Sequence, residues 1–470
     1  MHIRPRHILG FLIFIVLTSS ALVAQTAPSL APDLRHKIDD AATQILAKTG
    51  VPSASIAVVK DGRIAYVQAY GEAILDPKTP ARPEMRYSIG SISKQFTAVA
   101  ALLLQEQGKL SLDDKVSKYL PNLTRADEVT IRQLLSQTSG YQDYWPQDYV
   151  MPMMLKPVTV QQILDTWGRK PLDFDPGTKW QYSNTNYVIA GAIIEKASGK
   201  NVFALLTERV FTPLGMKSVY NTDEAKLPST EPTGYLRYAL GPLRPAPKEG
   251  KGWMFAAGEL AMTAEDLAKW DLAIIQRKIM SASSYKDFER EMLLDNGLGT
   301  QYALGNEIND DGGHRVLEHG GEVSGFVANN VVYPDDGVAI VVLTNQDAAP
   351  AAAQITKKIS DILFDVTDPQ TPAKLAQARA IFEDLQQGKI DRSLFTDNCN
   401  AYFSEQALQD FASSLGPLGK PADFSQTRQA LRGGMTLRVY RVLFERKTLR
   451  VWTYEMPDGK LEQYQVAITQ

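Results

Sequence analysis

The stretch Tyr87-Ser-Ile-Gly-Ser-Ile-Ser-Lys-Gln-Phe-Thr97 decides how this chain is interpreted, because Ser91 and Lys94 stand three positions apart in it. Apolar residues with helical spacing follow up to Gly108 and predict a buried helix over residues 93–107. Residues three apart share a helix face, so the hydroxyl and the ammonium should meet. Burial lowers the pKa of a lysine, and a neutral amine can activate a serine. Ser91 and Lys94 are therefore candidates for a nucleophile and its base.

The same pair has a simpler interpretation. Ser91 could cap a helix while Lys94 extends its ammonium to solvent. The pattern is short, and Ser283 and Lys286 repeat it without an apolar helix behind them. Other parts of the chain must decide between the two interpretations.

Composition excludes several classes of protein. The chain has 470 residues, 44% hydrophobic and 22% charged, which is typical of a soluble globular protein. A net charge of -3 without basic runs argues against nucleic-acid binding. The single cysteine, Cys399, excludes an intramolecular disulfide, and its polar surroundings without a nearby histidine favour a structural role.

Residues 1–27 have the pattern of a secretory signal peptide. Arg4 and Arg6 precede an apolar run over residues 8–16, and small residues at 21–24 offer a cleavage region. This pattern predicts a periplasmic or secreted protein. If the leader stays uncut, it would instead tether the protein to a membrane.

Strand signals lie at both ends of the first 365 residues. Alternating residues around Asp61-Gly62 predict a hairpin over 54–60 and 63–70, and residues 326–333 and 338–344 form a similar pair. Helices are predicted between and after these hairpins, over residues 93–107, 130–136, 160–166, 186–197, 264–275 and 352–363. This order indicates an α+β fold, with an antiparallel sheet packed by helices.

A second unit is predicted after a proline-containing linker over residues 366–374. Residues 375–470 combine helical patterns, at 373–387 and 404–415, with strand-like runs at 435–444, 448–455 and 461–468. This is a small α+β domain, loosely similar to cystatin-like or nuclear-transport-factor-like folds.

Further candidate site residues come from two loops or turns. Tyr182 could relay a proton beside a cation, and Asn184 could orient both a lysine and a substrate carbonyl. His319 precedes Gly320 and Gly321 at the start of the second strand pair, where a backbone N–H could bind an oxyanion. The histidines lack metal-ligand spacing, so neither a metal nor another cofactor is expected.

Together these motifs resemble the serine β-lactamase and penicillin-binding-protein superfamily, in particular class C β-lactamases, family VIII carboxylesterases and D-aminopeptidases. Its motif order is Ser-x-x-Lys, Tyr-x-Asn, then Lys-Thr-Gly or His-x-Gly, which here gives Ser91…Lys94, Tyr182…Asn184 and His319…Gly321. Flanking stretches also match, at Leu134-Leu-Ser-Gln-Thr-Ser-Gly140, Phe211-Thr-Pro-Leu-Gly-Met216 and Gly320-Gly-Glu-Val-Ser-Gly-Phe326. The resemblance covers residues 33–365 and implies an all-helical subdomain beside the sheet. Lys48-Thr-Gly50 precedes the nucleophile and is out of order.

The resemblance implies acyl transfer through Ser91, with Lys94 and Tyr182 sharing the role of base. It implies that Asn184 positions the substrate and that the N–H groups of Ser91 and Glu322 form the oxyanion hole. Which of Lys94 and Tyr182 is the base stays open here.

The departure at His319 bears on the substrate. Many relatives have a lysine there that holds a substrate carboxylate, whereas His319 would be largely uncharged. We therefore expect an exported esterase or D-amino-acid peptidase that acts on a small molecule or peptide. The alternatives are a penicillin-binding DD-peptidase, a weak class C-like β-lactamase, or a non-catalytic binding or sensor protein. Asp143, Tyr144, Trp145 and Tyr149 are candidates to line the cleft.

Overall fold

The computed structural model describes residues 30–364, apart from residue 148, and residues 370–468. The predicted signal peptide lies outside the described residues. Three clusters of buried apolar residues organise the chain: a large one among the central helices, a second beneath the sheet, and a third formed by residues 378–464. The fold class is α+β, as predicted.

A seven-stranded antiparallel sheet joins the two ends of the first part of the chain, in the order β3-β2-β1-β12-β11-β10-β9. Both predicted hairpins are present, as β1 (Ser53–Lys60) with β2 (Arg63–Leu75) and as β11 (Phe326–Tyr333) with β12 (Val338–Thr344). Asp61 and Gly62 both have positive φ, at 52° and 74°, as a tight two-residue hairpin turn requires. Because β1 pairs with β12, the two hairpins are neighbours in space.

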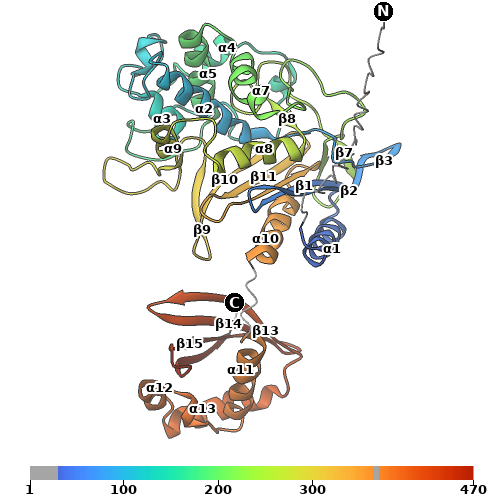
Figure 1. Cartoon of the computed structure of the whole chain (residues 1–470), viewed down its shortest axis with the longest axis vertical. Coiled ribbons are helices and arrows are strands. Elements are labelled where there is room, and N and C mark those ends of the chain that lie inside the picture. The colour runs from blue at the N-terminus through green and yellow to red at the C-terminus, as the bar shows by residue number, and fades with distance from the viewer. Residues whose placement is uncertain (1–29, 148, 365–369, 469–470) are drawn as a thin grey trace, which may run out of the picture.

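Helices bury both faces of the centre of this sheet. Ile340 and Val342 of β12 face α1 (Pro32–Thr49) and α10 (Ala351–Phe364), whereas Ala339 and Val341 face the large cluster that includes α8 (Ala264–Ile275). Figure 1 shows α8 on one side of the sheet and α1 with α10 on the other. Since neither face meets water, β12 is a continuous apolar run rather than an alternating one.

The helices between the hairpins form a region of their own beside the sheet (Figure 1). Its centre is α2 (Ser93–Glu106), which packs against α5 (Asn184–Ser198). The remaining helices of this region are α3 (Ile131–Leu135), α4 (Val160–Thr166), α6 (Val202–Leu206), α7 (Thr212–Leu214) and α9 (Ala282–Glu289). Short strands border it: β4 (Tyr87–Ser88), β5 (Tyr220–Asn221) and β8 (Leu260–Met262) form one small sheet, and β6 (Tyr235–Arg237) pairs with β7 (Leu243–Pro245).

The C-terminal unit has its own sheet and core. Its helices are α11 (Thr371–Leu385), α12 (Asp397–Tyr402) and α13 (Glu405–Leu415). Its strands β13 (Asp423–Arg432), β14 (Met435–Leu443), β15 (Thr448–Glu455) and β16 (Leu461–Ile468) form an antiparallel meander in chain order. Buried Phe382, Tyr440 and Tyr464 join the helices to this sheet.

The structure differs from the sequence-based prediction in several elements. Helix α1 and strands β9 (Glu307–Asp311), β10 (His314–Val323), β3 (Lys78–Pro80) and β13 were not anticipated. His319 and its glycines lie inside β10 and not at the start of a strand pair, because pairing with β11 overrides the low strand propensity of glycine. Part of the predicted linker, residues 366–369, lies outside the described residues, and residues 371–374 are helical because proline is tolerated in a first helical turn.

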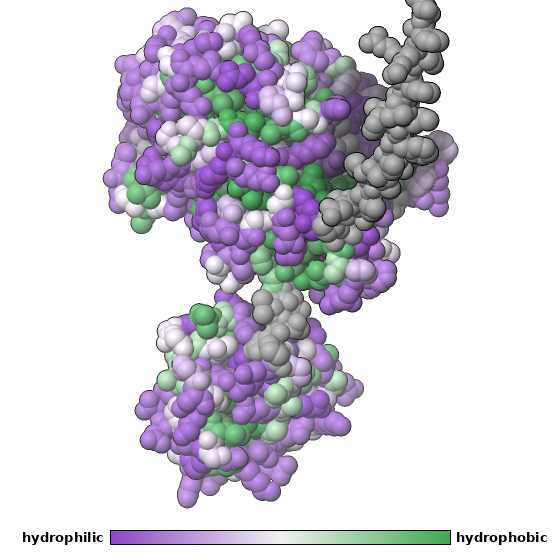
Figure 2. Space-filling view, in the orientation of Figure 1, coloured by the Kyte–Doolittle hydropathy of each residue, from purple (hydrophilic) through white to green (hydrophobic). Residues whose placement is uncertain are grey.

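Hydrophilic residues cover most of the face of the molecule seen in Figure 2. Among the described residues, no helix is both long and apolar enough to span a membrane.

Candidate active site

Two glycines bring the turn that holds Ser91 against the strand that holds His319. Ser91 lies in a 3-10 turn, Gly90–Ile92, that leads directly into α2. Gly90 has a φ of 50°, and a Cβ on it would lie 2.8 Å from the backbone nitrogen of Glu322. A Cβ on Gly321 would lie only 1.9 Å from the carbonyl oxygen of Ile89. The two backbones can therefore approach this closely only because neither position has a side chain.

Lys94 is fully buried, with 0% of its surface exposed. Its Nζ donates to Ser91 Oγ at 2.9 Å, to Asn184 Oδ1 at 2.8 Å and to the Ala257 carbonyl oxygen at 2.9 Å. Burial lowers the pKa of Lys94 to about 7, although the nearby charge of Asp143 acts to raise it. A substantial fraction of the amine is therefore neutral at neutral pH.

These contacts decide against the simpler interpretation of the Ser-x-x-Lys pair. In the described structure, neither the 3-10 turn nor α2 begins with a side-chain capping hydrogen bond, and Lys94 does not reach solvent. The repeat of the pattern, Ser283 and Lys286, lies exposed on α9. Lys48-Thr-Gly50 ends α1, outside the cavity described below.

Tyr182 lies beside this pair, in the loop that precedes α5. Its ring centroid is 4.8 Å from Lys94 Nζ and 6.3 Å from the His319 ring. Burial raises the pKa of Tyr182 above its usual value, and a hydrogen bond with Ser91 lowers it by a smaller amount. The phenol is therefore protonated at neutral pH and can donate a proton.

Asn184 begins α5 and connects Lys94 to Asp143. Its Oδ1 accepts from Lys94, and its Nδ2 donates to Asp143 Oδ2 at 3.3 Å. Asp143 Oδ1 also accepts from the backbone nitrogens of Asn184, at 3.0 Å, and of Trp145, at 3.1 Å. Asp143 thus holds both the side chain and the backbone of Asn184.

His319 is 3% exposed and hydrogen bonded at both ring nitrogens. Nδ1 lies 2.5 Å from the Gly320 carbonyl oxygen, so it carries the proton, and Nε2 accepts from the Tyr302 hydroxyl at 3.0 Å. Burial and the charge of Lys94 lower the pKa of His319 to about 4. The imidazole is therefore neutral over the physiological range.

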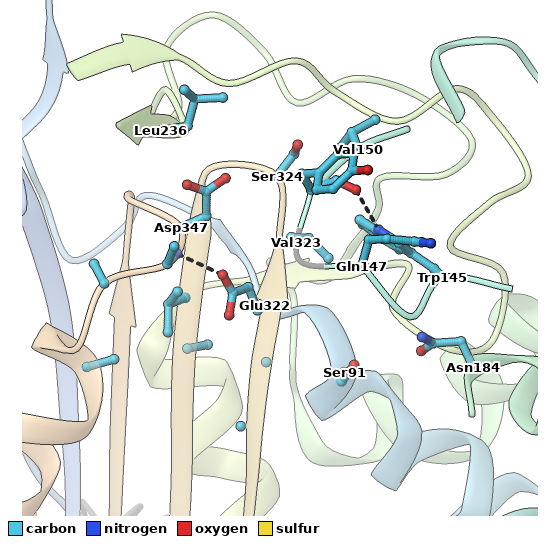
Figure 3. A pocket seen from close by; sticks show the side chains of 18 of the residues that line it. Ser91, Trp145, Gln147, Val150, Asn184, Leu236, Glu322, Val323, Ser324 and Asp347 are labelled. Atoms are coloured by element: carbon cyan, nitrogen blue, oxygen red, sulfur yellow. Dashed lines mark hydrogen bonds between the residues drawn. The ribbon is translucent and has the colours of Figure 1, made fainter. Parts of the chain in front are cut away.

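Ser91 opens into a cavity of about 690 Å³. Figure 3 shows Ser91 and Asn184 on one side, with Glu322 and Asp347 on the other. Of the four residues predicted to line the cleft, Tyr144, Trp145 and Tyr149 line this cavity. The fourth, Asp143, is hydrogen bonded to Asn184. The lining further includes Tyr182, His319, Gly320, Gly321, Glu322 and Arg237. All seven residues singled out for the site from sequence thus lie in or beside one cavity.

Sequence reasoning missed three contributors to this arrangement. The carbonyl of Ala257 has no side-chain signal, because any residue could supply it. Tyr302 precedes His319 by 17 residues and belongs to none of the three motifs. Gly90 could have been recognised, since a glycine next to a nucleophile often marks close backbone approach. Among the described residues, no group of three or more His, Cys, Asp or Glu side chains is placed to hold a metal ion.

Comparison with known proteins supplies the family. The profile described as Beta-lactamase matches residues 38–363. The chain belongs to the beta-lactamase family. The matched residues include the sheet, the helical region and the cavity, but not the C-terminal unit.

Individual known proteins are similar to this chain over about two thirds of its length or more. A D-aminopeptidase from Brucella anthropi is 29% identical over 320 residues, which is 67% of this chain and 60% of the relative. A penicillin-binding protein from Bacillus subtilis is 28% identical, over 76% of this chain and 79% of the relative. The crystal structure of a D-stereospecific amidohydrolase from Streptomyces sp. is 27% identical with a TM-score of 0.60, over 69% of this chain and 98% of that structure. The chain thus spans about 60% of the length of the D-aminopeptidase that it matches.

Proposed function

We propose that this protein is a serine hydrolase that cleaves an amide or ester through an acyl-enzyme on Ser91. The observation that carries the proposal is the contact of 2.9 Å between Ser91 Oγ and a fully buried Lys94, at the edge of an open cavity. A buried amine with a pKa of about 7 is matched to general-base catalysis near neutral pH.

The pKa values favour different roles for Lys94 and Tyr182. Neutral Lys94 takes the proton of Ser91 as Oγ attacks the substrate carbonyl, and the backbone N–H groups of Ser91 and Glu322 stabilise the resulting oxyanion. Tyr182, whose raised pKa keeps it protonated, gives its proton to the leaving amine or alcohol. It then recovers a proton from the Lys94 ammonium, and water hydrolyses the acyl-enzyme in a second cycle.

The cavity favours substrates that do not depend on a carboxylate contact at the third motif. His319 is neutral there, because its Nδ1 proton is directed to Gly320 and its pKa is about 4. Arg237 lines the cavity, but its guanidinium lies beside the end of α1, where a Cβ on Gly50 would be 3.1 Å away. Together with the similarity to a D-aminopeptidase and a D-stereospecific amidohydrolase, this supports a D-amino-acid amide or peptide, or an ester, as substrate.

A penicillin-binding peptidase or weak β-lactamase is the second candidate, favoured by the similarity to a Bacillus subtilis penicillin-binding protein. Intact-mass measurement after incubation with D-amino-acid amides, p-nitrophenyl esters and β-lactams separates the candidates by which compound leaves an acyl group. Ser91→Ala should abolish every adduct, and Ser283→Ala, the matched serine of the second Ser-x-x-Lys pattern, should abolish none. If chemically distinct acylating probes all fail to modify Ser91, the protein is a non-catalytic binding or sensor protein.

We also propose that the protein is exported, on the strength of the leader pattern in residues 1–27. Fractionation of cells that express the full chain, with N-terminal sequencing of the product, tests this. A cleaved product in the periplasm or medium supports export, an uncleaved membrane-bound product supports a tether, and an uncleaved cytoplasmic product refutes both.

A further inference from the structure

Asp143 occupies a position in the hydrogen-bond network that the proposed mechanism does not use. Its hydrogen-bonded link to Lys94 runs through Asn184, whose Oδ1 accepts from Lys94 and whose Nδ2 donates to Asp143. An amide side chain can be rotated by half a turn, which exchanges its donor and its acceptor. Asp143 settles which end of Asn184 faces Lys94, because an ionised carboxylate only accepts hydrogen bonds.

The donor count at Lys94 follows from this orientation. Nζ has three partners: Ser91 Oγ, Asn184 Oδ1 and the Ala257 carbonyl oxygen. The last two can only accept, so a neutral amine, which has two hydrogens, directs one to each of them. Its lone pair is then left for the third direction, toward Ser91 Oγ.

We propose that Asp143 is a positioning residue that fixes the Asn184 amide so that the lone pair of neutral Lys94 points at the Ser91 hydroxyl. If the amide were reversed, Nδ2 would face Nζ, and the lone pair of Lys94 would turn toward that donor instead. Asp143 therefore acts on the proton transfer from Ser91 to Lys94 without taking part in it. This inference rests on the proposed function, in which Lys94 is the base.

Other ionisable groups also face Lys94, and they must be kept constant in a test. The rings of Tyr182 and Tyr187 lie 4.8 and 5.4 Å from Nζ. His319 lies close enough for the charge of Lys94 to lower its pKa. Both tyrosines have raised pKa values and His319 a lowered one, so all three are neutral between pH 5 and 9, and Asp143 is the nearby charge.

The test compares Asp143→Asn with the exchange variant Asp143→Asn/Asn184→Asp. In the single variant the amide oxygen at position 143 still accepts from the two backbone N–H groups, so its NH2 group faces Asn184 and favours the reversed orientation of the Asn184 amide. We therefore expect acylation of Ser91 by a p-nitrophenyl ester to slow about 10- to 100-fold, part of what general-base catalysis contributes. The lower limb of the pH–rate profile should also move about one pH unit toward acid, because one nearby opposite charge no longer favours the ammonium.

The exchange variant restores the pattern of donors and acceptors with nearly identical atoms. The amide at position 143 donates to the carboxylate at position 184, which accepts from Lys94, while the remaining oxygen at 143 still accepts from the two backbone N–H groups. We expect most of the lost acylation rate to return at pH values above the lower limb of the pH–rate profile. The limb itself should move toward alkaline pH relative to wild type, since the negative charge now touches the ammonium. Asp173→Asn is the matched control, because the Asp173 side chain is exposed and accepts from the Gln181 side chain rather than from Asn184.

Several outcomes would overturn the inference. One is a single variant with wild-type rate and profile. Another is a slow single variant whose limb does not move and whose rate the exchange does not restore, which would make Asp143 merely structural. An exchange variant that does not fold, as judged by thermal melting, also contradicts it, because every hydrogen-bonded pair was kept. If wild-type protein is not acylated at Ser91 by any probe, the proposed function fails instead.

Discussion

Adding one methyl group at Gly321 should separate the two backbones that form the active site. A Cβ there would lie 1.9 Å from the carbonyl oxygen of Ile89, whereas real contacts of a Cβ are essentially never under 3.0 Å. In Gly321→Ala, β10 and the turn that holds Ser91 must therefore move apart by about 1 Å. A displacement of that size between reacting groups can cost about 100-fold in rate. Overpacking typically costs about 1–3 kcal/mol of stability as well.

The neighbouring glycine is the matched control. A Cβ on Gly320 would meet no atom within 4 Å, so Gly320→Ala adds the same methyl group to the same strand without a clash. The assay is the rate of acylation of Ser91 by a small p-nitrophenyl ester, measured by intact mass, together with thermal melting of each variant. We expect Gly321→Ala to be about 100-fold slower and to melt earlier, and Gly320→Ala to stay close to wild type. Equal behaviour of the two variants would refute the reasoning.

Three further predictions follow from the same contacts. The acylation rate should rise with pH through a limb near pH 7, where Lys94 loses its proton. His319→Gln should leave that limb in place, because His319 is already neutral at this pH. A limb that shifts in the His319→Gln variant would contradict this assignment. The folded state lowers the pKa of Lys94 from 10.5 to about 7, so between these values the unfolded chain holds one proton more. The wild type should therefore gain about 1.4 kcal/mol of unfolding free energy per pH unit relative to Lys94→Met from pH 7 to 10, measured by urea unfolding, and a constant difference would argue against the shift. Among the described residues, the hydrophobic core of the C-terminal unit shares no residue with the other two hydrophobic cores. The chain truncated after residue 364 should therefore still fold, as measured by circular dichroism. Its hydrolysis rate then shows whether the C-terminal unit contributes to turnover.

Local sequence patterns were sufficient to predict those elements whose turn residues and apolar residues agree with the turns and the burial seen in the structure. The Asp61-Gly62 hairpin, helix α4 and strands β11, β12, β15 and β16 were predicted with bounds close to those observed. Helix α1 was missed, and so was β13. In β10, Gly320 and Gly321 weaken the strand pattern, and only the pairing with β11 makes the segment a strand.

The sequence by itself determined the chemical inventory of the site: a serine and a lysine on one helix face, a tyrosine two positions before an asparagine, and a histidine before two glycines. Their order along the chain was enough to indicate the family. Tertiary structure alone decided the protonation states, because the pKa values of Lys94 and His319 depend on burial by residues far away in sequence. It also decided the direction of each hydrogen bond, since Asp143, Ala257 and Tyr302 act through contacts that exist only once β10, α2 and α5 have packed together.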